Sequence, residues 1–180
     1  NCRTPHDAIV NGVVMVPEDR KLQGIIPRMS VGRNISIGSL DQITNRLGFV
    51  NTRREEQIGL EGKANFNIKT PDLEKPIVEL SGGNQQKAIV ARWMSTKPEV
   101  LILDEPTKGI DVGAKSEFYN MICEFAKEGL AVILISSELP EVIGLSDRII
   151  VMRGRRIVGE ISAKDATEEK LLSMAMMEET

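Results

Sequence analysis

The chain has 180 residues, of which 41% are apolar and 27% charged, a composition typical of a soluble globular protein. The 26 acidic and 23 basic residues give a net charge of −3, so a primary nucleic-acid-binding role is disfavoured. Aromatic residues make up only 3%, too few for stacking platforms on bases or sugars. No apolar run reaches the length of a membrane-spanning helix. Because the first residue is Asn1 and no secretory signal follows, we interpret the sequence as a fragment.

The first part of the chain predicts one strand followed by a mainly helical region. Residues Gly12–Val16 are a short apolar run stopped by a proline, which favours a buried strand. Residues Glu18–Gly24 are charged and end in glycine, which predicts a loop. Between Met29 and Ile77 polar residues dominate, and we expect short helices with loops and little deep core.

From Glu79 onward, apolar runs alternate with helical patterns. Leu80–Gly83 predicts a turn and Asn84–Ser95 a helix. Such alternation predicts an α/β fold with a mainly parallel sheet covered by helices. The further predicted elements are buried strands at Val100–Leu103, Ala131–Ile135 and Arg148–Met152, a strand at Arg156–Ile161 that pairs with the last of these, and a terminal amphipathic helix at Thr167–Met177.

Another helix is predicted to begin after Asp111, whose side chain can cap it. Phe118, Ile122 and Phe125 recur at helical spacing and predict its buried face. Gly129 is expected to end this helix, because glycine is the usual residue just past a helix C-terminus.

Two acids end the predicted strand Val100–Leu103. The carboxyl ends of parallel strands are where open α/β folds bind ligands, so Asp104 and Glu105 are expected at that edge. Neighbouring residues point to different sides and can have different tasks. Asp104 can hold Mg²⁺ through its waters, and Glu105 can polarise an attacking water. Taken alone, the pair is more simply explained as a solvated acidic turn.

A second motif, Ser81-Gly82-Gly83-Asn84-Gln85, stands at the predicted start of a helix. Glycines there let a phosphate approach backbone N–H groups, the helix dipole attracts it, and Ser81 adds a hydroxyl donor. Taken alone, the motif is equally explained as a helix cap after a tight turn.

The two motifs stand 23 positions apart with one helix and one strand between them. Together they resemble the signature sequence and the Walker B strand of an ABC-type ATPase. Gly109-Ile110-Asp111 occupies the place of the D-loop, which in that family crosses the dimer interface. Glu18 follows its strand at the position where the family's Q-loop usually has glutamine.

A narrower resemblance rests on the segments GGNQQK, LDEPTKGIDVGAKSE and ISSELPEV. These are similar to the second half of the tandem ATPase subunit of bacterial monosaccharide importers of the ribose, galactose, arabinose and xylose type. Residues 17–27 (PEDRKLQGIIP) resemble the pentose members, arabinose most of all.

The resemblance implies a partial P-loop NTPase-like domain over residues 1–180, with a helical subdomain at about 30–95 and α/β core parts at 1–29 and 96–180. It implies ATP and Mg²⁺ as ligands. The implied partners are a second ABC half, membrane permease subunits and, indirectly, a sugar-binding protein. The implied location is peripheral, on the cytoplasmic face of the membrane. The residues that it assigns are Glu105 for catalysis; Ser81, Gly82, Gly83, Asn84, Gln85, Glu18, Asp111 and Ser137 for nucleotide; and Asp104 and Glu18 for metal.

Two departures from the family pattern change what this chain is expected to do. No GxxxxGK[ST] motif is present, so the P-loop is expected upstream of Asn1, and the isolated chain should bind ATP weakly or not at all. Ser137 stands where the family has a histidine that contacts the γ-phosphate. The resemblance then implies that this half has a poor site of its own, while its Ser81 motif completes the site of the partner half.

Two alternatives to a transporter ATPase remain open at this point. One is an ABC ATPase that works without a permease, although such proteins usually carry a basic arm or long charged helices, and none is seen here. The other is a regulatory half-domain that binds nucleotide without hydrolysing it, which the serine at position 137 favours.

Overall fold

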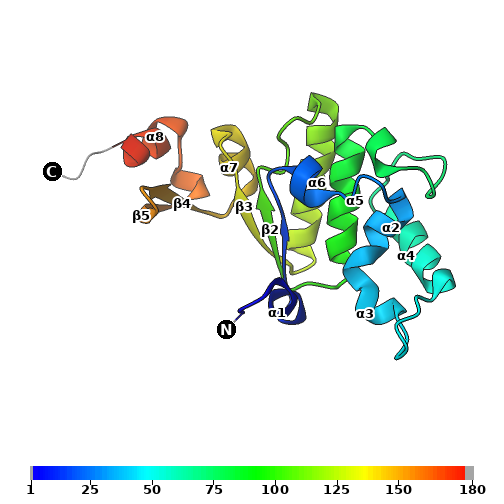
Figure 1. The fold of residues 1–180 in the computed structure, drawn as a ribbon. Helices are drawn as coiled ribbons and strands as arrows, with labels where there is room; N and C mark the ends of the chain where they lie inside the picture. Colours follow the sequence, from blue (N-terminus) through cyan, green and yellow to red (C-terminus); the bar gives the residue numbers. More distant parts are fainter. Residues whose placement is uncertain (1, 177–180) are drawn as a thin grey trace. The chain divides into compact units, whose positions relative to one another are not determined.

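The structure, a computed structural model, describes residues 2–176, and the chain divides into two units, Asn1–Ile133 and Leu134–Thr180 (Figure 1). The predicted end of the last helix, Met177, lies outside the described residues. Among residues 2–176, no helix combines the length and apolar character needed to cross a membrane.

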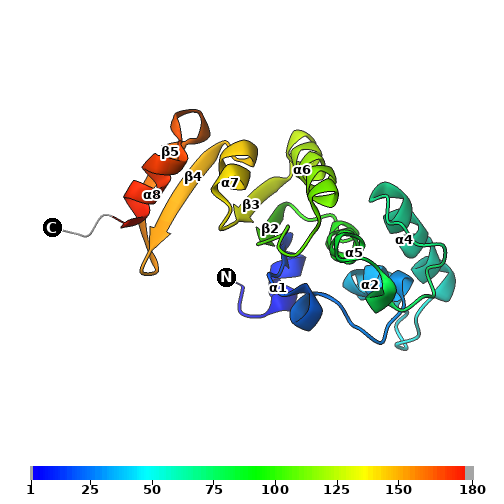
Figure 2. The same cartoon turned by 90° about the horizontal axis from the view of Figure 1, so that it is seen from above.

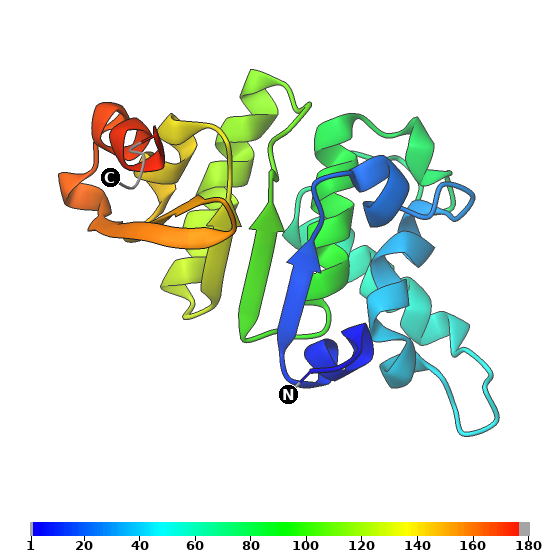
Figure 3. The ribbon, with the colours of Figure 1, turned by 60° about the vertical axis from the view of Figure 1, so that its left-hand side comes forward.

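The sheet of the first unit is built from the predicted apolar runs. Strands β1 (Val13–Val16), β2 (Val100–Asp104) and β3 (Ala131–Ile135) follow one another in the order β1-β2-β3. β1 lies beside β2 and runs parallel to it, as Figure 3 shows. In the register of this pair, Val16 is opposite Leu103. The parallel pairing confirms the prediction for these strands and brings Asp104 to the sheet edge at which β1 also ends.

Helices cover one face of this sheet. Strand β1 buries Val14 and Val16 on the covered side, whereas Met15 between them is 44% exposed. Helix α5 packs against β1, α2, α4 and α6, so it lies between the strands and the other helices (Figure 2). The helices of this unit are α1 (Pro5–Val10), α2 (Val31–Ser36), α3 (Leu40–Ile43), α4 (Thr52–Asn65), α5 (Gly82–Met94) and α6 (Val112–Lys127), with 3-10 turns at Ile37–Ser39 and Ile77–Glu79.

Helix starts and ends follow the local sequence closely. Asp111 caps α6 by accepting a hydrogen bond from the backbone N–H of Ala114, as predicted. Phe118, the first of the three predicted core residues of α6, is 1% exposed, and the other two are also buried. Gly129 follows the helix with a φ of +93°. Helix α5 begins two residues earlier than expected, so Gly82 and Gly83 lie in its first turn instead of in a preceding turn.

The expectation of little core between Met29 and Ile77 is wrong. Helix α2 packs against both α4 and α5, and Ile35 in its centre is fully buried. Gly62 allows the close approach of α4, because a Cβ there would lie 2.7 Å from Ile35 Cγ2. Isolated apolar residues in a polar stretch thus form a core through contacts between helices; the buried ones include Val31, Ile43, Ile58, Ile68 and Ile77.

Two further expectations need correction. The segment predicted as a loop contains one π-helical turn, η1 (Arg20–Gly24), which Asp19 caps by accepting from two backbone N–H groups. Strand β3 is not buried, since Ile133 is 50% exposed. The reason is that β3 ends the strand order of the described sheet; its odd-numbered residues are exposed and its even-numbered ones half-buried.

The second unit has its own small core. Strands β4 (Arg148–Arg153) and β5 (Arg156–Ser162) form the predicted antiparallel hairpin, whose turn residues Gly154 and Arg155 both have positive φ. Side chains from β4 and the last helix form its centre, with Ile149, Val151 and Leu171 buried. The helical elements of this unit are α7 (Leu139–Leu145), a 3-10 turn at Ala163–Asp165 and α8 (Glu168–Met176).

Candidate functional site

Three acids and one lysine gather where β1 and β2 end. The pKa of Asp104 is raised, first by burial and then by the negative charges of Glu18 and Glu105, while the positive charge of Lys108 opposes the shift. Charges shift the pKa of a neighbouring group in this way only when they lie near it. The structure therefore brings together the acids that the sequence assigned to metal binding and catalysis.

Glu105 has an unusual backbone conformation. Its φ is +45°, in the left-handed region that non-glycine residues rarely occupy. The chain turns sharply there, and the backbone N–H of Lys108 donates to the Glu105 carbonyl at 3.1 Å. Strained backbone of this kind is concentrated at functional sites.

Lys108 engages the acid that follows β1. Its Nζ lies 2.5 Å from Glu18 Oε1, and this bond with Glu18 is the main reason why the pKa of Lys108 is raised. Both side chains are at least half exposed, so the pair can open to solvent at little cost. Glu18, which follows β1, thus contacts the loop that follows β2.

The donor chemistry of this edge suits Mg²⁺, although it does not form a closed cage. Within the described residues, no three side chains of the His, Cys, Asp or Glu type come together as a metal-binding group. Mg²⁺ is usually held by only one or two carboxylates together with waters and phosphate oxygens. Burial is the first cause of the raised pKa of Asp104, and the negative charges of Glu18 and Glu105 add to it. A bound cation would offset that negative charge, and the carboxylates of Asp104 and Glu18 are ligands of the type that Mg²⁺ takes.

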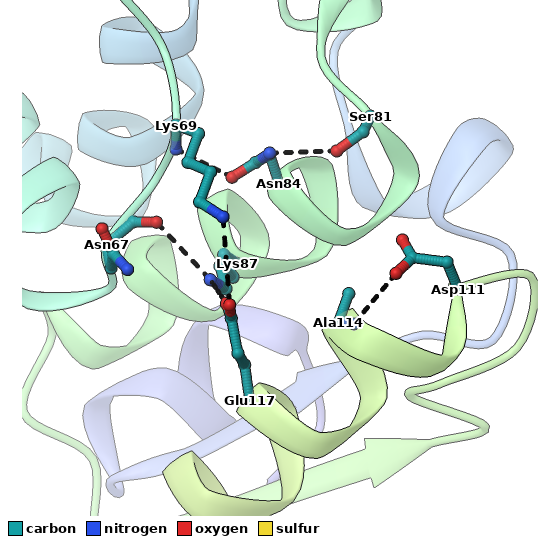
Figure 4. A network of polar contacts seen from close by, with 8 residues as sticks. All are labelled: Asn67, Lys69, Ser81, Asn84, Lys87, Asp111, Ala114 and Glu117. Carbon is teal, nitrogen blue, oxygen red and sulfur yellow. Dashed lines mark hydrogen bonds and ion pairs between the residues drawn. The ribbon is translucent and has the colours of Figure 1, made fainter.

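The start of α5 is arranged so that Ser81 can donate a proton outward. Asn84 donates from Nδ2 to Ser81 Oγ at 2.9 Å, and Asn84 Oδ1 in turn accepts from the backbone N–H of Lys69 at 2.8 Å (Figure 4). Because Ser81 Oγ already accepts a hydrogen bond, its own proton is available for an anion. Ser81 is exposed, and the N-terminus of a helix of this length attracts negative charge.

The remaining residues of the motif support this geometry from inside. Gln85 is buried, and its Nε2 donates to the carbonyls of Ile77 and Leu80, so its side-chain amide is occupied within the protein. Gly83 is also buried, and a Cβ there would lie 3.0 Å from the Cβ of Ala114 on α6. A side chain at position 83 would therefore strain the contact between α5 and α6 before it reached any phosphate.

A cavity of about 300 Å³ lies between the starts of α5 and α6. Its lining includes Ser81, Asn84, Lys87, Asp111 and Glu117. A larger cavity of about 950 Å³ lies between α4, α5 and α6 and is lined by residues of those helices, among which neither the acids after β2 nor Ser81 appears. We assign the smaller cavity to the candidate site, because it contains the exposed serine and the helix start.

Sequence reasoning missed a charged network beside this cavity. Lys87 Nζ lies 2.5 Å from Glu117 Oε2 and donates to the carbonyl of Asn67 at 3.4 Å, and Lys69 Nζ lies 3.9 Å from Glu117 Oε1 (Figure 4). The Lys87 side chain is only 8% exposed. A polar lysine at a core position of a predicted helix was the signal that could have indicated a buried partner.

Ser137 belongs to the second unit, where it is exposed and is the second residue after the end of β3. The neighbouring Ser136 is the one with described contacts: its hydroxyl hydrogen bonds to a carboxylate oxygen of Glu141 and accepts from the backbone N–H of Glu138. The assignment of Ser137 to the nucleotide stays a prediction.

Residues 4–108 match a family model described as ABC transporter. The chain is 54% identical over 177 residues to an arabinose import ATP-binding protein of Mannheimia succiniciproducens, covering 98% of this chain and 35% of that protein. It is 49% identical to a ribose import ATP-binding protein of Rhodopirellula baltica over 97% of this chain and 34% of that one. A xylose import ATP-binding protein of Yersinia pseudotuberculosis is 47% identical over 99% of this chain and 35% of its own length. The chain thus spans about a third of the length of these relatives.

Solved structures with this fold are ATP-binding cassettes. One cassette of an ABC transporter has a TM-score of 0.76 at 20% identity and covers 96% of this chain and 71% of its own. Another, solved as a dimer in a post-hydrolysis state with ADP and phosphate, has a TM-score of 0.72 at 17% identity over 91% of this chain and 68% of its own. These likenesses confirm the predicted α/β fold.

Proposed function

The chain belongs to the ABC transporter family, and on that premise we propose that it is part of an ATPase subunit that energises import of a monosaccharide. The relatives that it matches over nearly its whole length carry the names of arabinose, ribose and xylose import ATP-binding proteins. Among these sugars we favour arabinose, because residues 17–27 resemble the arabinose members most of all; the sugar itself would be selected by the binding protein and permease. The observation that carries the proposal is the exposed Ser81 hydroxyl at the start of α5, which Asn84 holds ready to donate.

In this proposal, the start of α5 acts on a nucleotide held by a second ABC half. Ser81 Oγ and the N–H groups of Gly82 and Gly83 would donate to the γ-phosphate across the interface, where they stabilise developing negative charge. Asp111, at the start of α6 and on the rim of the same cavity, would lie at that interface. Gln85 supports the segment that carries Ser81, and it does so from a buried position.

The acids after β1 and β2 would serve a nucleotide bound on this chain's own side. Asp104 and Glu18 would hold Mg²⁺ through water, and the ion would neutralise phosphate charge when bound. Glu105 would orient and polarise the attacking water from its place in the sharp turn after β2. Ser137, in place of a histidine, offers a single weak donor. We therefore expect the site on this side to be the less active of the two.

The expected partners follow from the same proposal. A second ABC half would complete each nucleotide site, and membrane permease subunits would dock near residues 18–34, which places the protein peripherally on the cytoplasmic face of the membrane. A sugar-binding protein would act on the permease and only indirectly on this chain. A non-hydrolysing regulatory half is the second candidate, and Ser137 is the observation that favours it.

The test is ATP hydrolysis by the full-length protein that contains this chain, assembled with its permease in liposomes. Ser81→Ala should lower turnover by about 10²–10³-fold, because a positioned donor to the transition state is lost. Glu105→Gln should cost far less if this chain's own site is the weaker one. Ser81→Ala is preferred to a substitution at Gly83, since that residue is packed against α6.

Matched controls are Ser173→Ala and Glu124→Gln, which change exposed residues on α8 and α6. Turnover in both should equal that of the wild type. If Glu105→Gln is as damaging as Ser81→Ala, the inferred division of labour is wrong. If the wild type hydrolyses no ATP, the hypothesis of a non-hydrolysing regulatory half replaces that of an ATP-hydrolysing subunit. Uptake of labelled arabinose, ribose and xylose would then fail as well.

A further inference from the structure

Arg20 joins two segments that are far apart in the sequence. It is the first residue of η1, separated by three residues from the end of β1 at Val16, and its guanidinium reaches the loop between β2 and α6. Nη1 donates to the carbonyl of Lys108 at 2.7 Å, and Nη2 donates to the carbonyl of Gly109 at 3.1 Å. Nε is buried and has no hydrogen-bond partner among the described residues, so the side chain gives up hydration to hold this position.

The same guanidinium lies against the start of α5. A Cβ at Gly82 would lie 2.6 Å from Arg20 Nη2 and 3.2 Å from the carbonyl oxygen of Gly109. A Cβ at Gly109, whose φ is +68°, would lie 3.5 Å from the same Nη2. Three segments therefore meet at one guanidinium, and glycine at position 82 is what leaves room for it.

The neighbouring ion pair between Glu18 and Lys108 does not explain this arrangement. Both of its side chains are at least half exposed, and exposed ion pairs contribute little to holding segments together. The guanidinium, in contrast, is planar and presents its donors in a fixed fork that matches two successive carbonyls. Lysine at position 20 would also be charged and could donate, but it lacks the rigid fork that aims two donors at two successive carbonyls.

We propose that Arg20 is a positioning residue that holds the 108–109 loop against the start of α5. Through this contact, the start of α5, which would face the phosphate, stays in a fixed position relative to the start of α6, which Asp111 caps. The consequence for ATP hydrolysis rests on the function proposed above, whereas the contact itself does not. The segment that leaves β1 thus sets the shape of the surface that meets the partner half.

Hydrogen exchange on the full-length protein tests the contact directly. In Arg20→Ala, the backbone N–H of Ile110, which donates to the carbonyl of Thr107, should exchange about tenfold faster, as expected for a loop that loses its external hydrogen bonds. Gly82→Ala should have the same effect, because its methyl group displaces Nη2. The double variant should exchange no faster than Arg20→Ala alone, because both substitutions remove one contact.

Arg53→Ala, at an exposed arginine of the first unit, serves as the control and should leave exchange of residues 108–111 unchanged. Arg20→Lys should restore part of the protection. The proposal is overturned if Arg20→Ala leaves exchange of residues 108–111 unchanged, or if the effects of the two alanine substitutions multiply in the double variant.

Turnover measured on the same proteins separates this inference from the proposed function. Arg20→Ala should lower kcat about tenfold while KM for ATP stays within about twofold, because the positioned groups act on the phosphate and do not hold the nucleotide. Faster exchange with unchanged kcat would overturn the positioning role in hydrolysis. A wild type without ATPase activity would refute the proposed function, and the exchange result would still decide on the contact.

Discussion

Removing the carboxylate of Glu117 should destabilise the first unit more than removing the lysine that it contacts. The Lys87 side chain is 8% exposed and Glu117 is 47% exposed, so the two partners differ in how well water can replace the lost contact. In Glu117→Gln, the buried ammonium loses its negatively charged partner and keeps a neutral amide oxygen and the Asn67 carbonyl at 3.4 Å as acceptors. Without the lysine, the carboxylate can be hydrated where it stands. We therefore expect Glu117→Gln to be the more costly change.

The magnitude follows from the geometry of the pair. Hydrogen bonds to charged groups contribute about 1.5–3 kcal/mol, and the partial exposure of Glu117 lowers this to about 1–2 kcal/mol for Glu117→Gln. In a protein of this size, that corresponds to a fall in Tm of about 2–8 °C. Lys87→Met removes a buried charge together with its desolvation cost and should lower stability by about half as much or less.

The pH dependence of this effect has a definite sign. The pKa of Glu117 is lowered, first by the hydrogen bond from Lys87 and then by its charge. A lowered acid pKa contributes stability that is fully present above the ordinary value of 4.5 and is lost as the pH falls through the folded-state value. The difference between the wild type and Glu117→Gln should therefore be full at neutral pH and shrink once the pH drops below 4.5.

The assay is urea unfolding followed by fluorescence of Trp93, the only tryptophan of the chain, which lies on α5 and reports on the first unit. Glu124→Gln is the matched control, because Glu124 lies on the same helix and contacts Lys127 at 2.6 Å, but both side chains are more than 60% exposed. It should change stability by less than about 0.5 kcal/mol. Equal losses in Glu117→Gln and Glu124→Gln, or a larger loss in Lys87→Met, would refute the reasoning.

Two further substitutions test the charge and hydrogen-bond assignments by the same assay. Asp104→Asn should raise Tm by about 1–3 °C at neutral pH, because burial and the charges of Glu18 and Glu105 raise the pKa of Asp104. The gain should shrink as the pH falls through the raised pKa and be lost below the ordinary value of 3.8; a loss of stability at neutral pH would contradict this. Arg92→Lys should lower the free energy of unfolding by about 2–4 kcal/mol, because lysine cannot replace the three hydrogen bonds of the buried guanidinium. These go to the carbonyl of Asn34 at 2.6 Å, to the carbonyl of Gly24 at 2.7 Å and to Asn34 Oδ1 at 2.9 Å. Burial lowers the pKa of Arg92 to about 10, so this cost should be constant between about pH 6 and 9, and a pH-dependent cost would show that another group titrates.

Local patterns were sufficient to predict most elements. Strands β1 and β2 are apolar runs bounded by turn residues, and both were expected within one residue of their observed ends. The cap at Asp111 and the buried face of α6 also follow from residues no more than a few turns apart. These features depend on interactions between neighbours in the chain, which is why the sequence shows them.

Contacts between distant residues could not be predicted in the same way. Arg92 and Asn34 are 58 positions apart, and Lys87 and Glu117 are 30 apart. Each looks like an ordinary surface residue of an amphipathic helix until α2, α5 and α6 pack together. The core between Met29 and Ile77 was missed for the same reason, because its isoleucines are isolated along the chain and adjacent only in space.

The conformation of the loop after β2 depends both on its local sequence and on a contact with a distant residue. It also indicates that the acid at position 105 has a function. A left-handed φ suits glycine, which the loop has at position 109 but not at position 105. Holding a glutamate there costs on the order of 1 kcal/mol or more. The turn bond to Glu105 and the guanidinium of Arg20 keep the loop in place despite that cost. Glycine would adopt this positive φ without strain. A glutamate at position 105 is therefore best explained by a chemical role of its carboxylate at this edge of the sheet.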